Sequence, residues 1–475
     1  MNGQTSEGLL SLFDTHRLNG RYWFVFSLLA LITVLEFFDF LVVGFLVAVL
    51  GPQWHLTYGQ SAVILYSGGL GAICGAVIWG ALSDAWGRKT QLVLGTFICG
   101  IGAGLIGFVP NGAWGLFAVL RFVVGFGLTA AVTPCLTIVV EQAPTRYRTS
   151  LSSFYVVFAT AGTLVASATS AVLLSALGWR GVAMLGALTI PVGIAIAIFV
   201  PESVRWLTAK GRFAEARAQV ARQLRLPLDQ VPLPTMPPAA QPSGRLSELY
   251  NNPRRFWDTV IIWGGSSTAA YGVYLWGPTI VALLLHIPVP QAAKYFVFVA
   301  GAGVVGKVLV TFISPIMGRR RCGQVFGFGA AVALVAAAYF NQVFVGGVPL
   351  LIVLMCVSTF GIDGGFSNLA PYTVEAFGVR MGARSSGLGQ AANGVGKILG
   401  PLSLALIAGT GNLVSPKATG DAVLPAFLFL AFGMLLVGLS FSLLGVETHG
   451  RAMTVDEEAD EATVQGEAGR RPAEA

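Results

Sequence analysis

The sequence predicts an all-α membrane protein, with twelve transmembrane helices in two pseudo-symmetric six-helix bundles. Hydrophobic residues make up 55% of the 475 residues and charged residues only 11%, whereas soluble proteins carry about 25% charged residues. Twelve apolar runs reach the roughly 20 residues that one bilayer crossing needs. Lys and Arg gather in alternate connections between these runs, as they do in membrane proteins of fixed orientation.

The twelve runs follow one another closely, except around one long polar segment at 201–254. The first run is too long for a signal peptide, and no small-residue cleavage site follows it. The runs are 22–50, 60–82, 91–109, 113–141, 149–177, 179–200, 255–285, 291–316, 322–344, 349–377, 384–412 and 423–445.

The distribution of basic residues predicts the orientation. Of the 29 Lys and Arg residues, 23 lie in the termini or in connections on one side, three on the opposite side and three inside the runs. Cytoplasmic loops carry the excess of Lys and Arg, so both termini and the 201–254 segment are expected in the cytoplasm. The net charge of +7 therefore reflects topology, and nucleic acid is not an expected partner.

The polar segments divide the chain into five parts. The middle segment contains RFAEARAQVARQLRL, which predicts an amphipathic helix, and the last segment is polar enough to be disordered. The predicted parts are a cytoplasmic N-terminal segment (1–21), a six-helix bundle (22–200), a cytoplasmic linker (201–254), a second six-helix bundle (255–445) and a cytoplasmic tail (446–475).

The two halves share short stretches. TIVVEQAPTRYRTS at the end of the fourth run is similar to PYTVEAFGVRMGARSS at the end of the tenth. GALSDAWGRK after the second run is echoed by FISPIMGRRR after the eighth. Related halves around a site near the membrane midplane are how many secondary transporters are built.

GALSDAWGRK resembles the G-x-L-x-D-x-x-G-R-K loop of the major facilitator superfamily. PESVRWLTAKGR and VETHGRAMTVDE resemble motifs of its sugar and metabolite porters, and the likeness extends from residue 20 to about 455. It implies alternating access, with gating residues at the cytoplasmic edge. In the second copy Pro315 replaces the acidic residue, so the corresponding latch is expected to be absent there. The implied gating residues are Gly80, Asp84, Gly87, Arg88, Glu141, Arg148, Glu375 and Arg384.

EFFD at 36–39 places two carboxylates near the middle of the first run. Glu36 and Asp39 share a helix face, and an acid inside a membrane span is a candidate functional residue. Two carboxylates this close in a low dielectric do not both ionise easily, so one is expected to load and release a proton. EFFD resembles the D-G-F-D of proton-coupled aromatic-acid porters and the equivalent stretch of sialate and lactate porters. The alternative is that one acid pairs with a cation and the other only packs.

Three cations also lie inside the runs: Arg121, Lys307 and Lys397. The acids available to them are the pair above and Asp363. Arg121, in LRFVVGFGLTA, resembles the R-x-x-x-G-x-G arginine that is linked to proton coupling in the family. Pairing of all three cations with acids is one possibility. If one acid carries a proton, one cation lacks a partner, and an anionic substrate would supply it at Lys307 or Lys397.

Polar and aromatic residues complete the expected substrate site. Gln390 and Asn393 share a helix face with the third cation of the set and either line a cavity or hold helices together. Tyr271 and Tyr274 lie deep enough in the seventh run to contact a ligand. Asn368 follows a Gly-Gly pair in the tenth run, where a loosened helix would expose backbone carbonyls.

The sequence contains no motif typical of an ATP-driven pump, a metal site or an enzyme. The chain has no phosphate-binding loop, no metal-ligand spacing and no nucleophile–base motif, so no cofactor, no metal site and no enzymatic activity are expected. The sequence therefore predicts a monomeric, proton-coupled symporter of a small organic anion, a carboxylate, in a bacterial-type inner membrane. The alternatives are a sugar or polyol symporter or a drug or metabolite exporter of the same fold, a signalling solute receptor, and a membrane-embedded enzyme.

Overall fold

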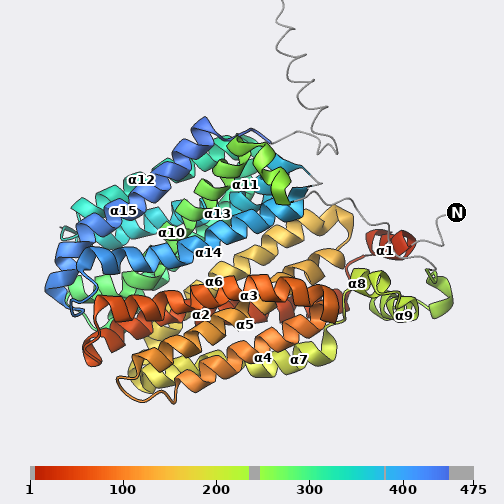
Figure 1. The fold of residues 1–475 in the computed structure, drawn as a ribbon, viewed down its shortest axis with the longest axis horizontal. Coiled ribbons are helices and arrows are strands. Elements are labelled where there is room, and N and C mark those ends of the chain that lie inside the picture. The colour runs from red at the N-terminus through yellow and green to blue at the C-terminus, as the bar shows by residue number, and fades with distance from the viewer. Residues whose placement is uncertain (1–5, 16, 235–245, 379–380, 449–475) are drawn as a thin grey trace, which may run out of the picture.

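The structure is a computed structural model that describes residues 6–15, 17–234, 246–378 and 381–448, and its long elements are helices (Figure 1). The N-terminal half contains α2 (Gly20–Gln53), α3 (Tyr58–Trp86), α4 (Arg88–Ile106), α5 (Trp114–Glu141), α6 (Thr145–Met184), η1 (Leu185–Leu188) and α7 (Thr189–Phe199). The C-terminal half contains α10 (Pro253–Leu284), α11 (Val289–Met317), α12 (Arg319–Tyr339), a short hairpin of β1 (Phe344–Val345) and β2 (Val348–Pro349), α13 (Leu350–Phe377), α14 (Gly382–Ala408) and α15 (Pro416–Leu443).

Eleven helical stretches of the described chain are long and apolar enough to cross a membrane. The longest, Phe154–Phe199, runs through most of α6, η1 and α7. It spans 46 residues, which would extend about 70 Å if straight, more than twice the hydrocarbon thickness. Its path reverses at Gly178, where the backbone leaves the helical region. Phe154 and Phe199 both contact rings near the start of α2, while Trp179 contacts Trp54 at its end. The prediction of twelve crossings is therefore confirmed.

The two halves repeat one packing pattern. In the N-terminal half α2 packs on α6, α3 on α5, and α4 on α7. In the C-terminal half the corresponding pairs are α10 with α14, α11 with α13, and α12 with α15. The halves meet through α2 with α10, α3 with α14, and α6 with α11, so the interface follows the same two-fold relationship.

The linker and the chain start form a small unit at one end of the bundle, here called the linker side (Figure 1). It contains α1 (Ser6–Thr15), α8 (Val204–Ala209), α9 (Phe213–Leu224) and η2 (Leu228–Gln230), whereas η3 (Leu246–Asn251) packs against α10 and α14. Leu9 and Phe13 of α1 share a small apolar core with α8 and α9. Asp14 accepts a hydrogen bond from the Thr145 N–H and pairs with Arg148, which attaches α1 to the start of α6.

Hydrogen bonds between the halves lie at the opposite end, here called the far side. The segments 56–59 and 410–414 form a main-chain bridge, the far-side bridge. The Tyr58 N–H donates to the Asn412 carbonyl at 2.9 Å, and the Gly59 N–H donates to the Thr410 carbonyl at 3.0 Å. The Val414 N–H donates to the Leu56 carbonyl at 3.0 Å, so in this conformation the far side is closed by backbone pairing.

Candidate functional site

An ion pair between Asp39 and Arg121 lies in the interior of the N-terminal half. The Arg121 Nη1 donates to Asp39 Oδ2 at 3.0 Å and to the Asp39 carbonyl at 2.9 Å, and Nη2 donates to the Phe40 carbonyl at 3.1 Å. Both side chains are about 1% exposed. An arginine held by three acceptors fixes the position of α2 relative to α5, because charge-assisted hydrogen bonds are strong in a low dielectric.

Glu36 lies one helical turn away from Asp39 and is completely buried. Neither of its carboxylate oxygens has a hydrogen-bond partner among the described residues. Both acids of the predicted pair therefore lie inside the N-terminal half rather than toward lipid. Only Asp39 has a cation beside it, so the two carboxylates occupy different electrostatic environments.

A second ion pair lies in the C-terminal half. Lys307 of α11 places its Nζ 3.7 Å from Asp363 Oδ1 of α13, and the Tyr274 hydroxyl donates to Asp363 Oδ2. All three residues are buried. The predicted substrate residues Lys307, Asp363 and Tyr274 thus form one cluster, in which Asp363 is the partner of both the ammonium and the hydroxyl.

Lys397 of α14 is the third of the predicted cations, and no acid of the described chain pairs with it. Its Nζ lies 5.3 Å from the centre of the Phe40 ring and 5.5 Å from the centre of the Tyr271 ring. These rings meet edge to face at 5.7 Å. Phe40 belongs to the N-terminal half and Tyr271 to the C-terminal half, so the ammonium lies at the interface between the halves.

The polar stripe of α14 continues from Lys397 toward the linker side. The Ser267 hydroxyl donates to Asn393 Oδ1 at 2.8 Å, and Asn393 Nδ2 donates to Gln390 Oε1 at 3.0 Å. Ser267 and Asn393 are buried, whereas Gln390 is exposed. Lys397, Asn393 and Gln390 therefore follow one another along α14, with Tyr271 of α10 beside the lysine, and their role in substrate binding stays a prediction.

The structure places Asn368, a predicted substrate contact, between helices, and its role in substrate binding stays a prediction. Its side chain is completely buried near the linker side, where Oδ1 accepts from the Ser314 hydroxyl at 3.0 Å and Nδ2 donates to the Arg319 carbonyl at 2.8 Å. The expected loosening of the helix is absent, because α13 is helical from Leu350 to Phe377. A buried amide in a membrane helix is used both for helix-helix contacts and for ligand contacts, so residue type alone does not separate the two roles.

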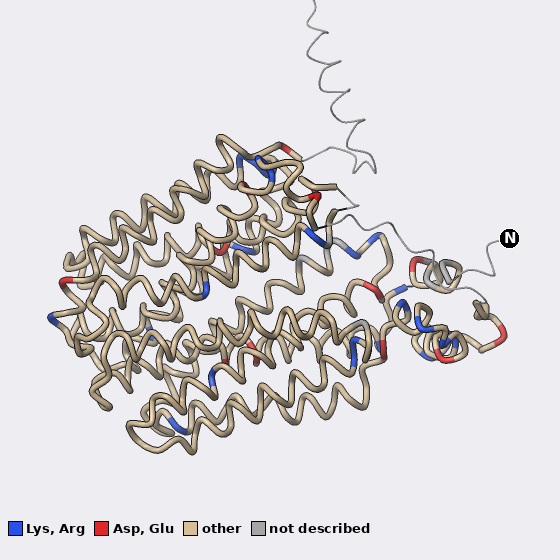
Figure 2. Tube along the Cα trace, in the orientation of Figure 1, with Lys and Arg blue, Asp and Glu red and all other residues tan. Residues whose placement is uncertain are grey.

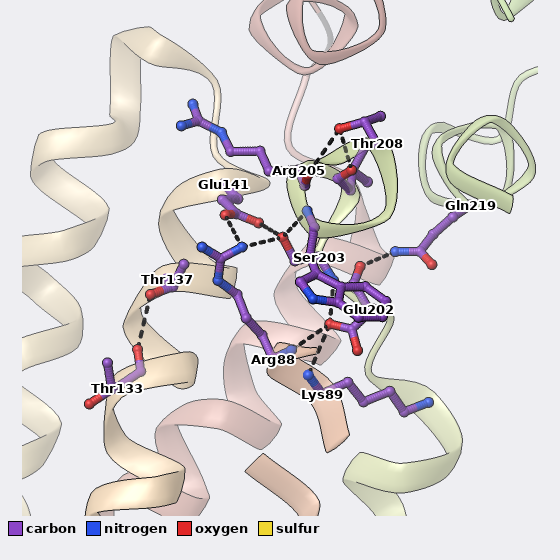
Figure 3. A network of polar contacts seen from close by, with 12 residues as sticks. Arg88, Lys89, Thr133, Thr137, Glu141, Glu202, Ser203, Arg205, Thr208 and Gln219 are labelled. Atoms are coloured by element: carbon purple, nitrogen blue, oxygen red, sulfur yellow. Dashed lines mark hydrogen bonds and ion pairs between the residues drawn. The ribbon is translucent and has the colours of Figure 1, made fainter. Parts of the chain in front are cut away.

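A polar network joins the start of α4, the end of α5 and the segment after α7 at the linker-side end of the N-terminal half (Figure 3). Arg88 pairs with Glu141 at 3.2 Å, and the Ser203 hydroxyl donates to Glu141 at 2.5 Å. Glu202 accepts the N–H groups of Arg88 and Lys89 at 2.9 and 3.0 Å. These N–H groups are free because α4 begins here, and a carboxylate at a helix N-terminus is favoured.

The C-terminal half repeats this arrangement. Arg319 pairs with Glu375 at 3.0 Å. Glu447 accepts the N–H groups of Arg319 and Arg320 at 2.8 and 3.3 Å. Gly87 and Gly318 precede these N–H groups, with φ of 93° and 84°, a backbone conformation that favours glycine.

Several predicted gating residues lie outside the two polar networks. The C-terminal half has Pro315 at the position of Asp84 and forms a polar network around Arg319 and Glu375 without that acid, so the absence of an Asp84-type latch there stays a prediction. Arg148 pairs with Asp14 instead of joining the network around Arg88, and Arg384 is exposed. Gly80 is exposed, with open space around it, and the side chain of Asp84 lies outside the described part of the chain.

Two functional candidates were missed by the sequence analysis. Glu202 and Glu447 lie inside PESVRW and VETHGR, the motifs that follow the last helix of each half. Each carboxylate contacts a helix that is far away in the sequence, α4 or α12. Neither periodicity nor spacing could predict such a contact. The signal available was the recurrence of an acidic residue directly after each six-helix half.

The paired halves and the charged residues at their interface define a membrane carrier. The sequence profile of the Major Facilitator Superfamily matches residues 29–401, and the chain belongs to this family. It is therefore a multi-pass membrane transporter and not an enzyme, as the sequence predicted.

Proteins similar to this chain include two transporters of small molecules. The niacin transporter NiaP of Acinetobacter baylyi is 27% identical over 416 residues, covering 87% of this chain and 91% of the relative. The 4-hydroxybenzoate transporter PcaK of Pseudomonas aeruginosa is 30% identical over 200 residues, covering 42% and 44%. The inward open structure of the Escherichia coli xylose transporter XylE superposes with a TM-score of 0.71 at 16% identity, covering 93% of this chain and 99% of that one; this likeness shows the fold alone.

Proposed function

We propose that the protein moves a small organic acid anion together with protons by alternating access. The observation that carries this proposal is the ammonium group of Lys397, which lies between the halves without an acidic partner in the described chain. A cation at membrane depth without a counter-ion is costly. The carboxylate of a substrate would supply the missing charge at the interface that alternating access exposes to each side in turn.

The relatives support an aromatic acid as the preferred anion. Niacin and 4-hydroxybenzoate, named for two of them, are both carboxylic acids on an aromatic ring. In this chain Phe40 and Tyr271 flank the Lys397 ammonium. Aromatic rings favour offset or edge-to-face contacts with another ring, so a flat aromatic acid would contact both rings while its carboxylate pairs with the lysine.

We assign proton coupling to Glu36, Asp39 and Arg121. Glu36 is fully buried and its oxygens lack partners in the described chain, so its protonated form is the one that suits an apolar interior. Asp39 is the acid that holds Arg121. Protonation of Asp39 would remove half of this ion pair and free α2 to move relative to α5, which would couple proton loading to the change of conformation.

We also propose that the linker side faces the cytoplasm of a bacterial-type inner membrane. Lys and Arg gather at that end of the molecule (Figure 2), and excess basic residues mark the cytoplasmic side. Because one chain contributes both halves of the interface around Lys397, a monomer is sufficient for the proposed site.

Uptake into proteoliposomes tests the proposal. The wild-type protein should accumulate labelled pyridine-3-carboxylate or 4-hydroxybenzoate when an inward proton gradient is imposed, and only equilibrate without it. Lys397→Gln should abolish carboxylate uptake and counterflow, whereas Lys417→Gln, a matched change on the far side, should leave both intact. Counterflow of sugars but not of carboxylates by the wild type would overturn the proposal.

A further inference from the structure

The side chains of Ser267, Asn393 and Gln390 form a hydrogen-bond chain with a direction. The Ser267 hydroxyl donates to Asn393 Oδ1, and Asn393 Nδ2 donates to Gln390 Oε1. This contact occupies the carbonyl oxygen of Gln390. Its Nε2 has no partner in the part of the chain that the structure describes, and an amide nitrogen only donates. The open end of the chain therefore presents hydrogen-bond donors.

That open end points along the same face as Lys397. At 100° per residue, Lys397 lies within about 20° of Gln390 around the axis of α14, whereas Val395 and Leu399 lie about 140° to 180° away. Val395 and Leu399 are exposed apolar residues, which suits a lipid-facing side. The exposure of Gln390 therefore arises on the face that meets the N-terminal half, where Gly394 packs on Ile73 of α3.

Along the axis of α14, Gln390 and Lys397 are separated by about the length of a small aromatic acid with its hydrogen bonds. Seven residues separate the two positions, which corresponds to about 10 Å along the helix, and Asn393 lies about 6 Å from Lys397. The hydrogen bond from Asn393 draws the Gln390 amide toward Lys397. A cation and a pair of amide donors thus lie on the same face of α14, one nearer the far side and the other nearer the linker side.

We propose that Gln390 is a specificity-determining residue that selects anions carrying a hydrogen-bond acceptor across the ring from their carboxylate. This inference rests on the proposed function, because Lys397 must hold the carboxylate for Gln390 to contact the opposite end. Asn393 and Ser267 act as positioning residues that fix which end of the Gln390 amide faces the substrate. An apolar ring edge in the same place would leave the Gln390 donors without an acceptor, and an unpaired polar group lowers affinity.

Binding of isosteric probes to the purified full-length protein tests this inference. Benzoate, pyridine-3-carboxylate and pyridine-4-carboxylate differ by one ring atom, which in the pyridines only accepts a hydrogen bond. Calorimetric titration should show that the better pyridine carboxylate binds about 3- to 10-fold more tightly than benzoate, as expected for one hydrogen bond. In Gln390→Met this ratio should fall to about 1, because the thioether offers no donor to a ring nitrogen and leaves no donor unpaired beside an apolar ring edge.

Matched variants separate this inference from the proposed function. Gln324→Met, on the linker side of α12, should keep the wild-type ratio, and Ser267→Ala should lower the ratio without abolishing benzoate binding. Equal binding of benzoate and both pyridines by the wild type would overturn the inference and leave the proposed function intact. Preference for the donor-only 1H-pyrrole-3-carboxylate over benzoate would also overturn it. Absence of binding by every carboxylate would instead refute the proposed function.

Discussion

Lys397 of α14 reaches across the interface between the halves and places its ammonium 5.3 Å from the centre of the Phe40 ring in α2. The guanidinium of Arg121 lies 6.0 Å from the same ring and bonds the Phe40 carbonyl. One residue therefore contacts the cation of the proposed substrate site and the cation of the proposed proton site. Phe40 directly follows Asp39, so only one residue along the chain separates the ion pair from the ring beside Lys397.

We expect Phe40→Leu to uncouple proton and substrate movement. Removal of the ring takes away contacts of about 0.5–2 kcal/mol with each cation, so Lys397 no longer responds to the Asp39–Arg121 pair. Counterflow in proteoliposomes should persist, while the stimulation by a proton gradient should fall several-fold. Phe45→Leu is the control, since Phe45 lies on the same helix and contacts Phe296 across the interface. An equal loss in both variants would contradict the prediction.

Asp39→Asn and Glu36→Gln should differ in stability. Asp39→Asn leaves the Arg121 charge buried without a counter-ion, which costs about 3–5 kcal/mol. Glu36→Gln removes no hydrogen bond of the described chain, so its effect on unfolding should be small. Thermal unfolding in detergent measures the difference, and a larger loss for Glu36→Gln would contradict the assignment of Asp39 as the partner of Arg121. Proton-driven uptake should fail in both variants.

Variants of Lys307 and Lys397 should also differ in stability. Lys307→Met leaves Asp363 buried without its cation, so the unfolding temperature should fall by the equivalent of about 3–5 kcal/mol. Lys397→Met removes a charge that has no acidic partner in the described chain, so stability should hold or rise. Titration of the same samples with pyridine-3-carboxylate should show binding lost in Lys397→Met. Binding retained in that variant would remove Lys397 from the substrate site.

Gly59→Ala should weaken closure of the far side. A Cβ at Gly59 would lie 2.9 Å from the Thr410 carbonyl oxygen, closer than packing allows, so the far-side bridge must shift. We expect faster labelling by a membrane-impermeant thiol reagent of a cysteine introduced at Leu413, which takes part in the bridge. Gly115→Ala is the control, because a Cβ there meets open space. Unchanged labelling in Gly59→Ala would show that the bridge is not the closure.

Glu202→Gln and Glu447→Gln should act alike. Each carboxylate accepts the first N–H groups of a helix, α4 in one half and α12 in the other. Loss of the charge at a helix N-terminus and of charge-assisted hydrogen bonds should cost about 1–3 kcal/mol in each half. Thermal unfolding of the two single variants and the double variant should show additive effects, since the sites lie in different halves.

Composition and periodicity were sufficient for the membrane fold. Runs of about twenty apolar residues must cross the bilayer as helices, because no water is present to satisfy an exposed backbone. The repeated stretches indicated two related halves, and helical spacing placed Gln390, Asn393 and Lys397 on one face. These conclusions depend only on local rules, which is why they hold without knowledge of the packing.

Pairing between helices could be decided only by the tertiary structure. The sequence offered three cations and three acids but no means to match them, because each pair joins helices that lie far apart in the chain. The structure matches Arg121 with Asp39 and Lys307 with Asp363, and leaves Glu36 and Lys397 without a charged partner in the described residues. In a low-dielectric interior a few ångströms decide whether a charge is neutralised, and those distances are set by helix packing and not by residue spacing.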